Sequence, residues 1–258
     1  MLLYITEKCS LGCPHCIDDA KPDGKHMSFK TLEASMEFLV KNNIYQSIVV
    51  TGGEPTEHPE FSMFMGYITE TLAKHNLKSM ITVTTNGFWI LENEENREVC
   101  KQIAKGCKDV RVQFQVSADK RYYPKRLDVT KRIWREKGFT LCDDCIISIY
   151  PQGRAKTNNL EWSAKGSKCF NVRALSKQLP NPTLETLVAG LYVNLKFCTP
   201  SIKINGDIVL GESVLCPTCA SIYDNPDDII KKIQNFKCHG CDMINDKLPP
   251  LYQQFLWL

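Results

Sequence analysis

The chain lacks long apolar segments, repeats and low-complexity tracts. No stretch approaches the roughly 20 consecutive apolar residues that cross a bilayer, and the apolar start, residues 1–5, is too short for the core of a signal peptide. No periodicity of the kind found in solenoid proteins is present. We therefore expect a soluble cytoplasmic protein without a membrane partner.

An excess of charge of either sign is also missing. The 32 Lys and Arg and the 29 Asp and Glu residues leave a formal net charge of +3. Nucleic-acid-binding proteins carry a concentrated basic field, and disordered tails are often strongly acidic. The near balance predicts a folded protein without a nucleic-acid partner.

Hydrophobic residues and cysteines are plentiful. A chain of 258 residues with 43% hydrophobic content can bury roughly three quarters of its unfolded surface, so one large domain or one domain with a small appendage is expected. The 13 cysteines are an odd number without a signal peptide, which argues against a secreted disulfide framework. Reduced, metal-binding thiols are the better interpretation.

Short apolar runs alternate with amphipathic runs over the first 150 residues, as in strand-helix units around a parallel sheet. The pattern therefore predicts an α/β fold. Strands are predicted at residues 2–6, 47–51, 79–84, 110–116 and 146–150. Helices are predicted from Phe29 after an N-cap at Ser28, from Phe61 after Pro59, at 97–105 before Gly106, and at 129–137 before Gly138.

The pattern changes after Tyr150, where Pro and Gly become frequent and six cysteines follow. Asn205-Gly206 lies between two strand-like runs over residues 197–209, which predicts a hairpin with a type I′ turn. A short helix at 227–235 begins at Pro226 with Asn225 as its cap. We predict two domains, residues 1–165 and a smaller one at 166–258.

Cys9, Cys13 and Cys16 lie on one loop directly after the first predicted strand. Parallel sheets and barrels place their chemistry at this carboxyl end of the strands. Three thiolates can hold three irons of a [4Fe-4S] cluster and leave the fourth iron open, as catalytic metal sites leave one position vacant. A zinc loop or a set of buried thiols is the alternative for three cysteines alone.

The CxxxCxxC spacing, together with Thr51-Gly52-Gly53-Glu54-Pro55 after the second strand, resembles the defining motifs of the radical S-adenosylmethionine (SAM) superfamily. The resemblance implies a partial (β/α)6 barrel and a [4Fe-4S] cluster on the three cysteines. It also implies reductive cleavage of SAM to a 5′-deoxyadenosyl radical that abstracts hydrogen from an unactivated C–H bond. Gly52, Gly53 and Glu54 would receive the SAM amino group, because glycines allow close approach and a carboxylate accepts hydrogen bonds.

Further SAM-binding residues follow from the same resemblance. His15 would pack near the adenine, while polar residues after the third and fourth strands would contact the methionine carboxylate and the ribose. Arg154 would pair with a carboxylate of SAM or substrate. Alternatively, His15 is an ordinary surface histidine, and the strand-end residues are polar groups of the kind found at strand ends in any α/β protein. The strand-end residues are Thr85, Asn86, Ser117 and Asp119.

Four later cysteines resemble the SPASM and twitch modules, in which a hairpin and a short helix carry an auxiliary [4Fe-4S] cluster. They are Cys198, Cys216, Cys238 and Cys241, with Cys219 as a possible ligand. The alternative is a zinc ribbon, because the CxxC pairs at 216–219 and 238–241 are separated by 18 residues. The CxxC formed by Cys142 and Cys145 is read as half-buried thiols or a redox pair.

The resemblance predicts an anaerobic oxidoreductase or maturase that receives electrons from flavodoxin or ferredoxin. We expect its substrate to be a ribosomal peptide that is cross-linked, epimerised or oxidised. Only eight residues precede Cys9, which leaves no room for a leader-peptide-binding domain and counts against a peptide. The overall length resembles that of an aminocyclitol dehydrogenase, so a sugar-like or aminocyclitol alcohol is the alternative substrate. A non-catalytic zinc or redox protein on the same fold is the third possibility.

Overall fold

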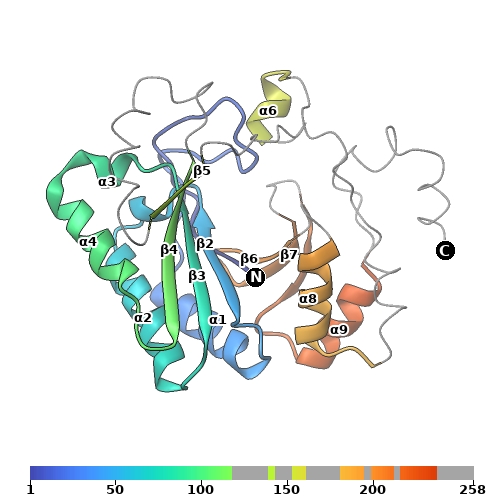
Figure 1. Ribbon diagram of the computed structural model, residues 1–258. Coiled ribbons are helices and arrows are strands. Elements are labelled where there is room, and N and C mark those ends of the chain that lie inside the picture. Colours follow the sequence, from blue (N-terminus) through green and yellow to red (C-terminus); the bar gives the residue numbers. More distant parts are fainter. Residues whose placement is uncertain (118–138, 143–152, 161–180, 195–198, 212–215, 237–258) are drawn as a thin grey trace.

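A computed structural model describes residues 1–117, 139–142, 153–160, 181–194, 199–211 and 216–236. In these residues one sheet has the strand order β5-β4-β3-β2-β1-β6-β7-β8 (Figure 1). The predicted strand at 146–150 and helix at 129–137 lie outside this part of the chain. The strands are β1 (Leu2–Thr6), β2 (Ser47–Gly52), β3 (Ser79–Thr85), β4 (Val110–Ser117), β5 (Phe139–Cys142), β6 (Pro200–Ile202), β7 (Asp207–Leu210) and β8 (Thr218–Ser221).

Side-chain caps set the start of several helices. Ser28 accepts a hydrogen bond from the Thr31 amide and Asn225 accepts one from the Asp227 amide, so both predicted N-caps are confirmed. The helices are α1 (Phe29–Lys41), the 3-10 helix η1 (Pro55–Glu57), α2 (Phe61–Lys74), α3 (Phe88–Glu92), α4 (Glu94–Ala104), α6 (Gly153–Thr157), α8 (Leu184–Asn194) and α9 (Pro226–Gln234).

Helix α4 begins three residues before its predicted start, because Asn93 caps it by accepting from the Asn96 amide. Its predicted end is confirmed by Gly106, which has a positive φ of 57° just after the helix. Helix α8 was not predicted from the sequence. Its first turn is capped by the Thr183 hydroxyl, which accepts from the Thr186 amide.

Strands β1 to β5 are parallel, and β6 is parallel to β1 on the other side. The carboxyl ends of these strands therefore meet at one edge of the sheet. This arrangement confirms the predicted α/β fold with a partial parallel barrel. The division of the chain at residue 165 stays a prediction.

The predicted hairpin joins β6 to β7, but its turn is not type I′. That type requires a positive φ at both central residues, and Gly206 has one while Asn205 does not. The Gly206 amide donates to the Lys203 carbonyl, and the Lys203 amide donates to the Asp207 carbonyl. The loop is therefore one residue longer, a turn followed by a left-handed glycine.

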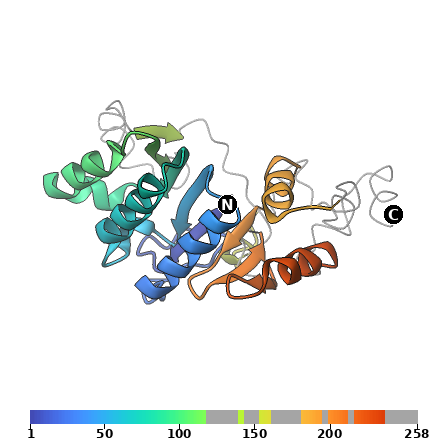
Figure 2. The ribbon, with the colours of Figure 1, turned by 90° about the horizontal axis from the view of Figure 1, so that it is seen from below.

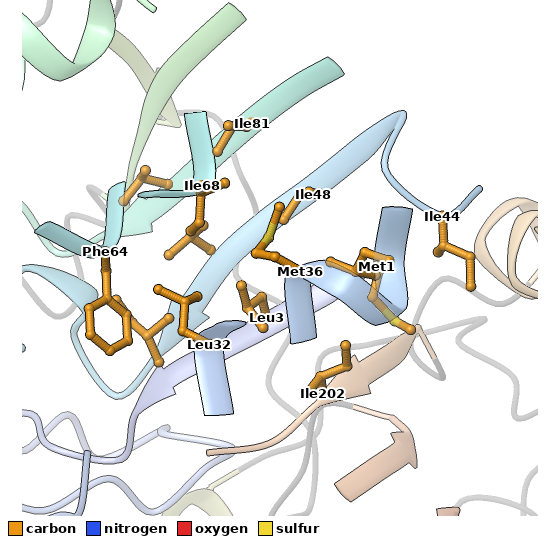
Figure 3. Packing of buried hydrophobic residues seen from close by; sticks show 14 of the residues in the cluster. Met1, Leu3, Leu32, Met36, Ile44, Ile48, Phe64, Ile68, Ile81 and Ile202 are labelled. Atoms are coloured by element: carbon orange, nitrogen blue, oxygen red, sulfur yellow. The ribbon is translucent and has the colours of Figure 1, made fainter. Parts of the chain in front are cut away.

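The core lies between the sheet and helices that cover one of its faces (Figures 1 and 2). Leu3, Ile48 and Ile81 of the first three strands pack against Met36 of α1 and Ile68 of α2 (Figure 3). All five side chains are fully buried. Because side chains alternate along a strand, the residues next to the core-facing ones in each strand point to the opposite side of the sheet.

We call this opposite side the inner face, and polar uncharged side chains predominate on it. The Gln113 amide donates to the Thr82 hydroxyl at 3.2 Å across β3 and β4, and Thr84 is paired in register with Gln115. Polar residues on the inner face include Tyr4, Thr51, Thr82, Thr84, Gln113, Gln115 and Ser117. Within the described ranges no helix combines the length and apolar character needed to cross a membrane.

His58 connects the start of α2 to the segment that precedes α1. Its Nδ1 accepts from the Glu60 amide at 3.1 Å, so its Nε2 carries the proton donated to the Met27 carbonyl, also at 3.1 Å. The ring is buried, lies edge-on to His26 with centroids 5.0 Å apart, and packs on Phe64. Burial lowers the pKa of His58 and of His26.

We expect His58 and His26 to lower the stability as the pH falls below about 6.5, whereas Asp18, whose pKa burial raises to about 7, acts in the opposite direction. Because the folded state lowers the pKa of both histidines, the unfolded state binds more protons there, so the free energy of unfolding falls with the pH. Urea unfolding at pH values from about 5 to 7 measures this. Compared with the wild type, His58→Gln should make the free energy of unfolding fall less between about pH 7 and 5, and His26→Gln, at an exposed position, should have a smaller effect in the same direction. Slopes equal to that of the wild type would contradict the assignment.

Candidate functional site

The loop that carries Cys9, Cys13 and Cys16 leaves the carboxyl end of β1 and folds back beside it. The Cys9 amide donates to the Lys21 carbonyl at 2.9 Å, and the Met27 amide returns to the Ile5 carbonyl at 2.8 Å. Cys9 is buried, whereas Cys13 and Cys16 are partly exposed, and all three are reduced cysteines. The loop therefore presents three thiols at the edge where the parallel strands end.

Gly52 and Gly53 bring the end of β2 into direct contact with this loop. The Gly53 amide donates to the Thr6 carbonyl at 2.8 Å, and the Glu54 amide donates to the Lys8 carbonyl at 2.7 Å. A Cβ at Gly52 would overlap the Thr6 carbonyl oxygen, and one at Gly53 would overlap that of Lys8. The two glycines thus allow close approach of the chain's own backbone. Their contact with SAM stays a prediction.

Glu54 is 1% exposed and accepts hydrogen bonds from four donors. Its Oε1 accepts from the Thr56 amide at 3.2 Å, and from the Thr56 and Thr85 hydroxyls at 2.6 Å each. Its Oε2 accepts from the Asn86 amide at 2.7 Å. Burial raises the pKa of Glu54, while these hydrogen bonds lower it. The carboxylate joins the ends of β2 and β3, and its predicted contact with an ammonium group is untested.

Thr85 and Asn86 lie between Glu54 and the cysteine loop. The Thr85 hydroxyl also accepts from the Gly87 amide at 3.0 Å. The Asn86 Nδ2 lies 3.9 Å from the Cys9 Sγ, and its Oδ1 accepts from the Phe88 amide at 2.9 Å. The structure thus brings these two predicted site residues together with Cys9.

Glu57 was not identified from the sequence, although it holds the residue that follows Cys9. Its two carboxylate oxygens accept from the Ser10 amide at 2.9 and 3.1 Å, and Oε2 also accepts from the Ser10 hydroxyl at 2.7 Å. The one sequence signal for Glu57 is that it is an acidic residue within the segment from Glu54 to His58. Its partner is 47 residues away, so no local pattern indicates the contact.

Arg154 lies against the other end of the cysteine loop. Its Nε donates to Asp19 at 3.2 Å, its Nη1 donates to the Cys13 carbonyl at 3.0 Å, and its Nη2 donates to the Ala20 carbonyl. The prediction paired Arg154 with a carboxylate of SAM or substrate. In the structure Arg154 pairs with the carboxylate of Asp19 within the chain, and its contact with SAM or substrate stays a prediction.

Lys203 connects the C-terminal hairpin to the same loop. Its Nζ lies 3.4 Å from the centre of the Tyr4 ring and 3.8 Å from the Asp18 Oδ1. Burial raises the pKa of Asp18 to about 7, although the Lys203 charge opposes this rise. An ion pair with both side chains only 20% exposed therefore lies where the inner face meets the cysteine loop.

The cysteine loop fits an iron-sulfur cluster. Burial raises the pKa of Cys9 to about 11 and also raises the pKa of Cys16, so a metal would have to replace their protons. Among the described residues no three His, Cys, Asp or Glu side chains gather as ligands of one ion. A [4Fe-4S] cluster has no such requirement, because each thiolate binds a different iron. Soft thiolates on one loop suit iron and sulfide better than a hard cation.

The remaining predicted residues divide into two groups. His15 lies half-buried on the loop, Ser117 ends β4, and Cys216 is partly exposed. Cys219 on β8 packs against the core, and burial raises its pKa to about 12. Other predicted residues or their side chains lie outside the described part of the chain. These are Asp119, Cys142, Cys145, Cys198, Cys238 and Cys241.

A parallel α/β sheet with three thiols on the loop after its first strand defines a class of enzymes that use an iron-sulfur cluster. The sequence profile of the Radical SAM superfamily matches residues 3–139, which is more than half of the chain. The chain therefore belongs to the radical SAM superfamily. Membership implies an enzyme with a [4Fe-4S] cluster and SAM.

Solved structures with this fold include several radical SAM proteins. BtrN in complex with AdoMet (SAM) and 2-DOIA is 14% identical, with a TM-score of 0.55 over 90% of this chain and 82% of that one. The anSMEcpe protein with bound AdoMet and the Cp18Cys peptide is 14% identical, with a TM-score of 0.53 over 89% and 78%. SuiB of Streptococcus suis bound to the precursor peptide SuiA is 15% identical, with a TM-score of 0.49 over 92% and 66%. No curated protein matches the chain by sequence.

We expect Gly53→Ala to lower the free energy of unfolding by about 1–3 kcal/mol, because its methyl group would force β2 away from the cysteine loop. Gly66→Ala in α2 is the matched control, since a Cβ there meets nothing within 4 Å. Alanine favours helices, so this control should raise the free energy of unfolding by up to about 1 kcal/mol. Chemical denaturation measures both, and equal effects would show that the Gly53 contact is unimportant.

Proposed function

We propose that the protein is a radical SAM oxidoreductase or maturase that abstracts hydrogen from an unactivated C–H bond of a polar substrate. When bound, the cluster and SAM supply the 5′-deoxyadenosyl radical. The observation that carries the proposal is the contact of Gly53 and Glu54 with the backbone of Thr6 and Lys8, the segment that leads directly into Cys9 at the carboxyl end of β1. Two family motifs that are separate in the sequence thereby form one site.

The chain's own residues hold and shield this site. Cys9, Cys13 and Cys16 are the proposed thiolate ligands, and Asn86 places its amide beside the Cys9 sulfur. The Glu54 carboxylate keeps the ends of β2 and β3 together, so the backbone that would receive SAM is ordered before SAM binds. Preorganisation of this kind removes part of the cost of binding.

A ribosomal peptide is the proposed substrate, and its maturation consists of cross-linking, epimerisation or oxidation. The anSMEcpe structure supports this proposal, because it contains a bound peptide and its fold matches most of both chains. At 14% identity the likeness concerns the fold, and so the peptide is a hypothesis for this chain.

A sugar-like or aminocyclitol alcohol is the second candidate, and the inner face favours it. Thr82, Thr84 and Gln113 place hydroxyl and amide groups on that face, and a ring with several hydroxyl groups requires many neutral hydrogen-bond partners. The BtrN structure, which contains 2-DOIA, is consistent with such a substrate. The share of both chains over which its fold matches is similar to that found for anSMEcpe.

We further propose a second [4Fe-4S] cluster in a twitch-like module, held by Cys198, Cys216, Cys238 and Cys241. It would accept the electron left on the substrate radical, which makes the net reaction an oxidation. Flavodoxin or ferredoxin would supply the electron that starts the reaction. A cavity of about 1140 Å³ lined by Ser10, Glu57 and Trp89 adjoins the cysteine loop.

Anaerobic reconstitution with iron and sulfide should yield about eight irons per chain, and reduction with SAM present should release 5′-deoxyadenosine. Substituting Cys9, Cys13 and Cys16 together by alanine should abolish the release and reduce the iron content to about four. Iron analysis and chromatography of the nucleoside measure these outcomes.

Cys107→Ala is the control, because Cys107 is an exposed thiol away from the loop, and it should retain full activity. Cleavage of SAM by the triple variant would contradict the proposed function. If the wild type contains about one zinc and four irons per chain, the C-terminal cysteines form a zinc ribbon and not a second cluster.

The two substrate classes can be separated by deuterium transfer. We expect a deuterated Cys-containing peptide such as Cp18Cys to increase the formation of 5′-deoxyadenosine and to transfer deuterium into it, because the radical abstracts directly from the substrate. Mass spectrometry of the nucleoside measures the transfer. Deuterium transfer from deuterated 2-DOIA and none from the peptide would select the second candidate.

A further inference from the structure

Helix α6 lies against the cysteine loop, although more than 130 residues separate them (Figure 1). The Arg154 amide donates to the Cys16 carbonyl at 2.8 Å. Gly153 has a φ of 54°, and a Cβ there would overlap the carbonyl oxygens of Cys16 and Ile17. The backbone of α6 therefore lies in direct contact with the backbone at the third cysteine.

The side chain of Arg154 reaches both sides of Cys16. It donates to the Cys13 carbonyl on one side, and to the Ala20 carbonyl and the Asp19 carboxylate on the other. A guanidinium group has its donors in a rigid planar fork, so these three bonds fix the relative positions of the acceptors. Lysine has the same charge on a flexible chain and cannot reproduce the fork.

Arg154 also places a positive charge beside two of the cysteines. Its side chain is 19% exposed, so water screens this charge only partly. The guanidinium donates to the backbone on both sides of Cys16, so its charge lies close to the two cysteines.

We propose that Arg154 is a positioning residue that fixes the spacing of Cys13 and Cys16 and makes a cluster on these cysteines easier to reduce. The first effect comes from the hydrogen-bonded fork and exists before any cluster binds. The second comes from the charge, because a nearby cation favours the state with one more electron. The second effect rests on the proposed function, since it requires a cluster on these cysteines, whereas the first does not.

Hydrogen exchange of the cluster-free protein tests the first effect. We expect Arg154→Lys and Arg154→Gln to increase the exchange of the amides of residues 9–21 by about tenfold or more, because local opening becomes easier. The amides of α1 should exchange as in the wild type, which shows that each variant is folded. Wild-type exchange rates in the cysteine loop of both variants would overturn the claim that the Arg154 hydrogen bonds hold the loop.

A redox titration of the reconstituted protein, followed by electron paramagnetic resonance, tests the second effect. Arg154→Gln should lower the reduction potential of the first cluster, whereas Arg154→Lys should keep most of the wild-type value. Lys156→Gln removes an exposed charge from the same helix and should leave the potential and the exchange unchanged. An equal shift in Lys156→Gln, or no shift in Arg154→Gln, would overturn the role of the charge.

Asn158→Ala separates the two effects, because Asn158 donates to the Pro14 carbonyl at 2.9 Å and carries no charge. It should increase loop exchange modestly and leave the potential unchanged. If the wild type binds no cluster and releases no 5′-deoxyadenosine, the proposed function fails. The exchange experiment then still decides whether Arg154 holds the loop.

Discussion

The buried carboxylate of Glu54 is the contact on which the rest of the site depends. A carboxylate that is 1% exposed is costly unless donors replace its lost water, and here Thr56 of η1 and the end of β3 supply four. Removing one of them would leave a buried charge poorly compensated, so Thr85 and Asn86 are held in place by the same energy. Because the Glu54 amide also donates to the Lys8 carbonyl, the arrangement extends from this charge to the strand that leads to Cys9.

The cysteine loop is held mainly by residues that are distant in the sequence. Glu57 binds the Ser10 backbone, Arg154 binds on both sides of Cys16, and Lys203 pairs with Asp18. These contacts come from η1, from α6 and from the turn between β6 and β7. A loop ordered in this way has little conformational entropy left to lose when it binds a cluster and SAM. The enzyme's contribution to radical chemistry is of this kind, since the cofactor performs the difficult step.

Local features were predicted well where local physics decides them. The caps at Ser28 and Asn225 depend on neighbouring residues, and the alternating strands of a parallel sheet show in the apolar pattern. The turn at Asn205-Gly206 was predicted wrongly, because the register of β6 and β7 left a loop one residue longer. The contacts of Glu57, Lys203 and Arg154 with the cysteine loop were not predicted, because each joins segments that only the folded chain brings together.

The sequence by itself determined the chemistry available to this protein. The spacing of Cys9, Cys13 and Cys16 and the Gly52-Gly53-Glu54 segment are local, and they identify the superfamily before any fold is known. Only the tertiary structure decided how these groups are held. Gly52 and Gly53 contact the backbone just before Cys9. Arg154 lies across the cysteine loop and donates to its backbone. The reason is physical: which thiols and carboxylates exist is a property of the chain, but their desolvation and hydrogen-bond partners depend on packing between distant segments.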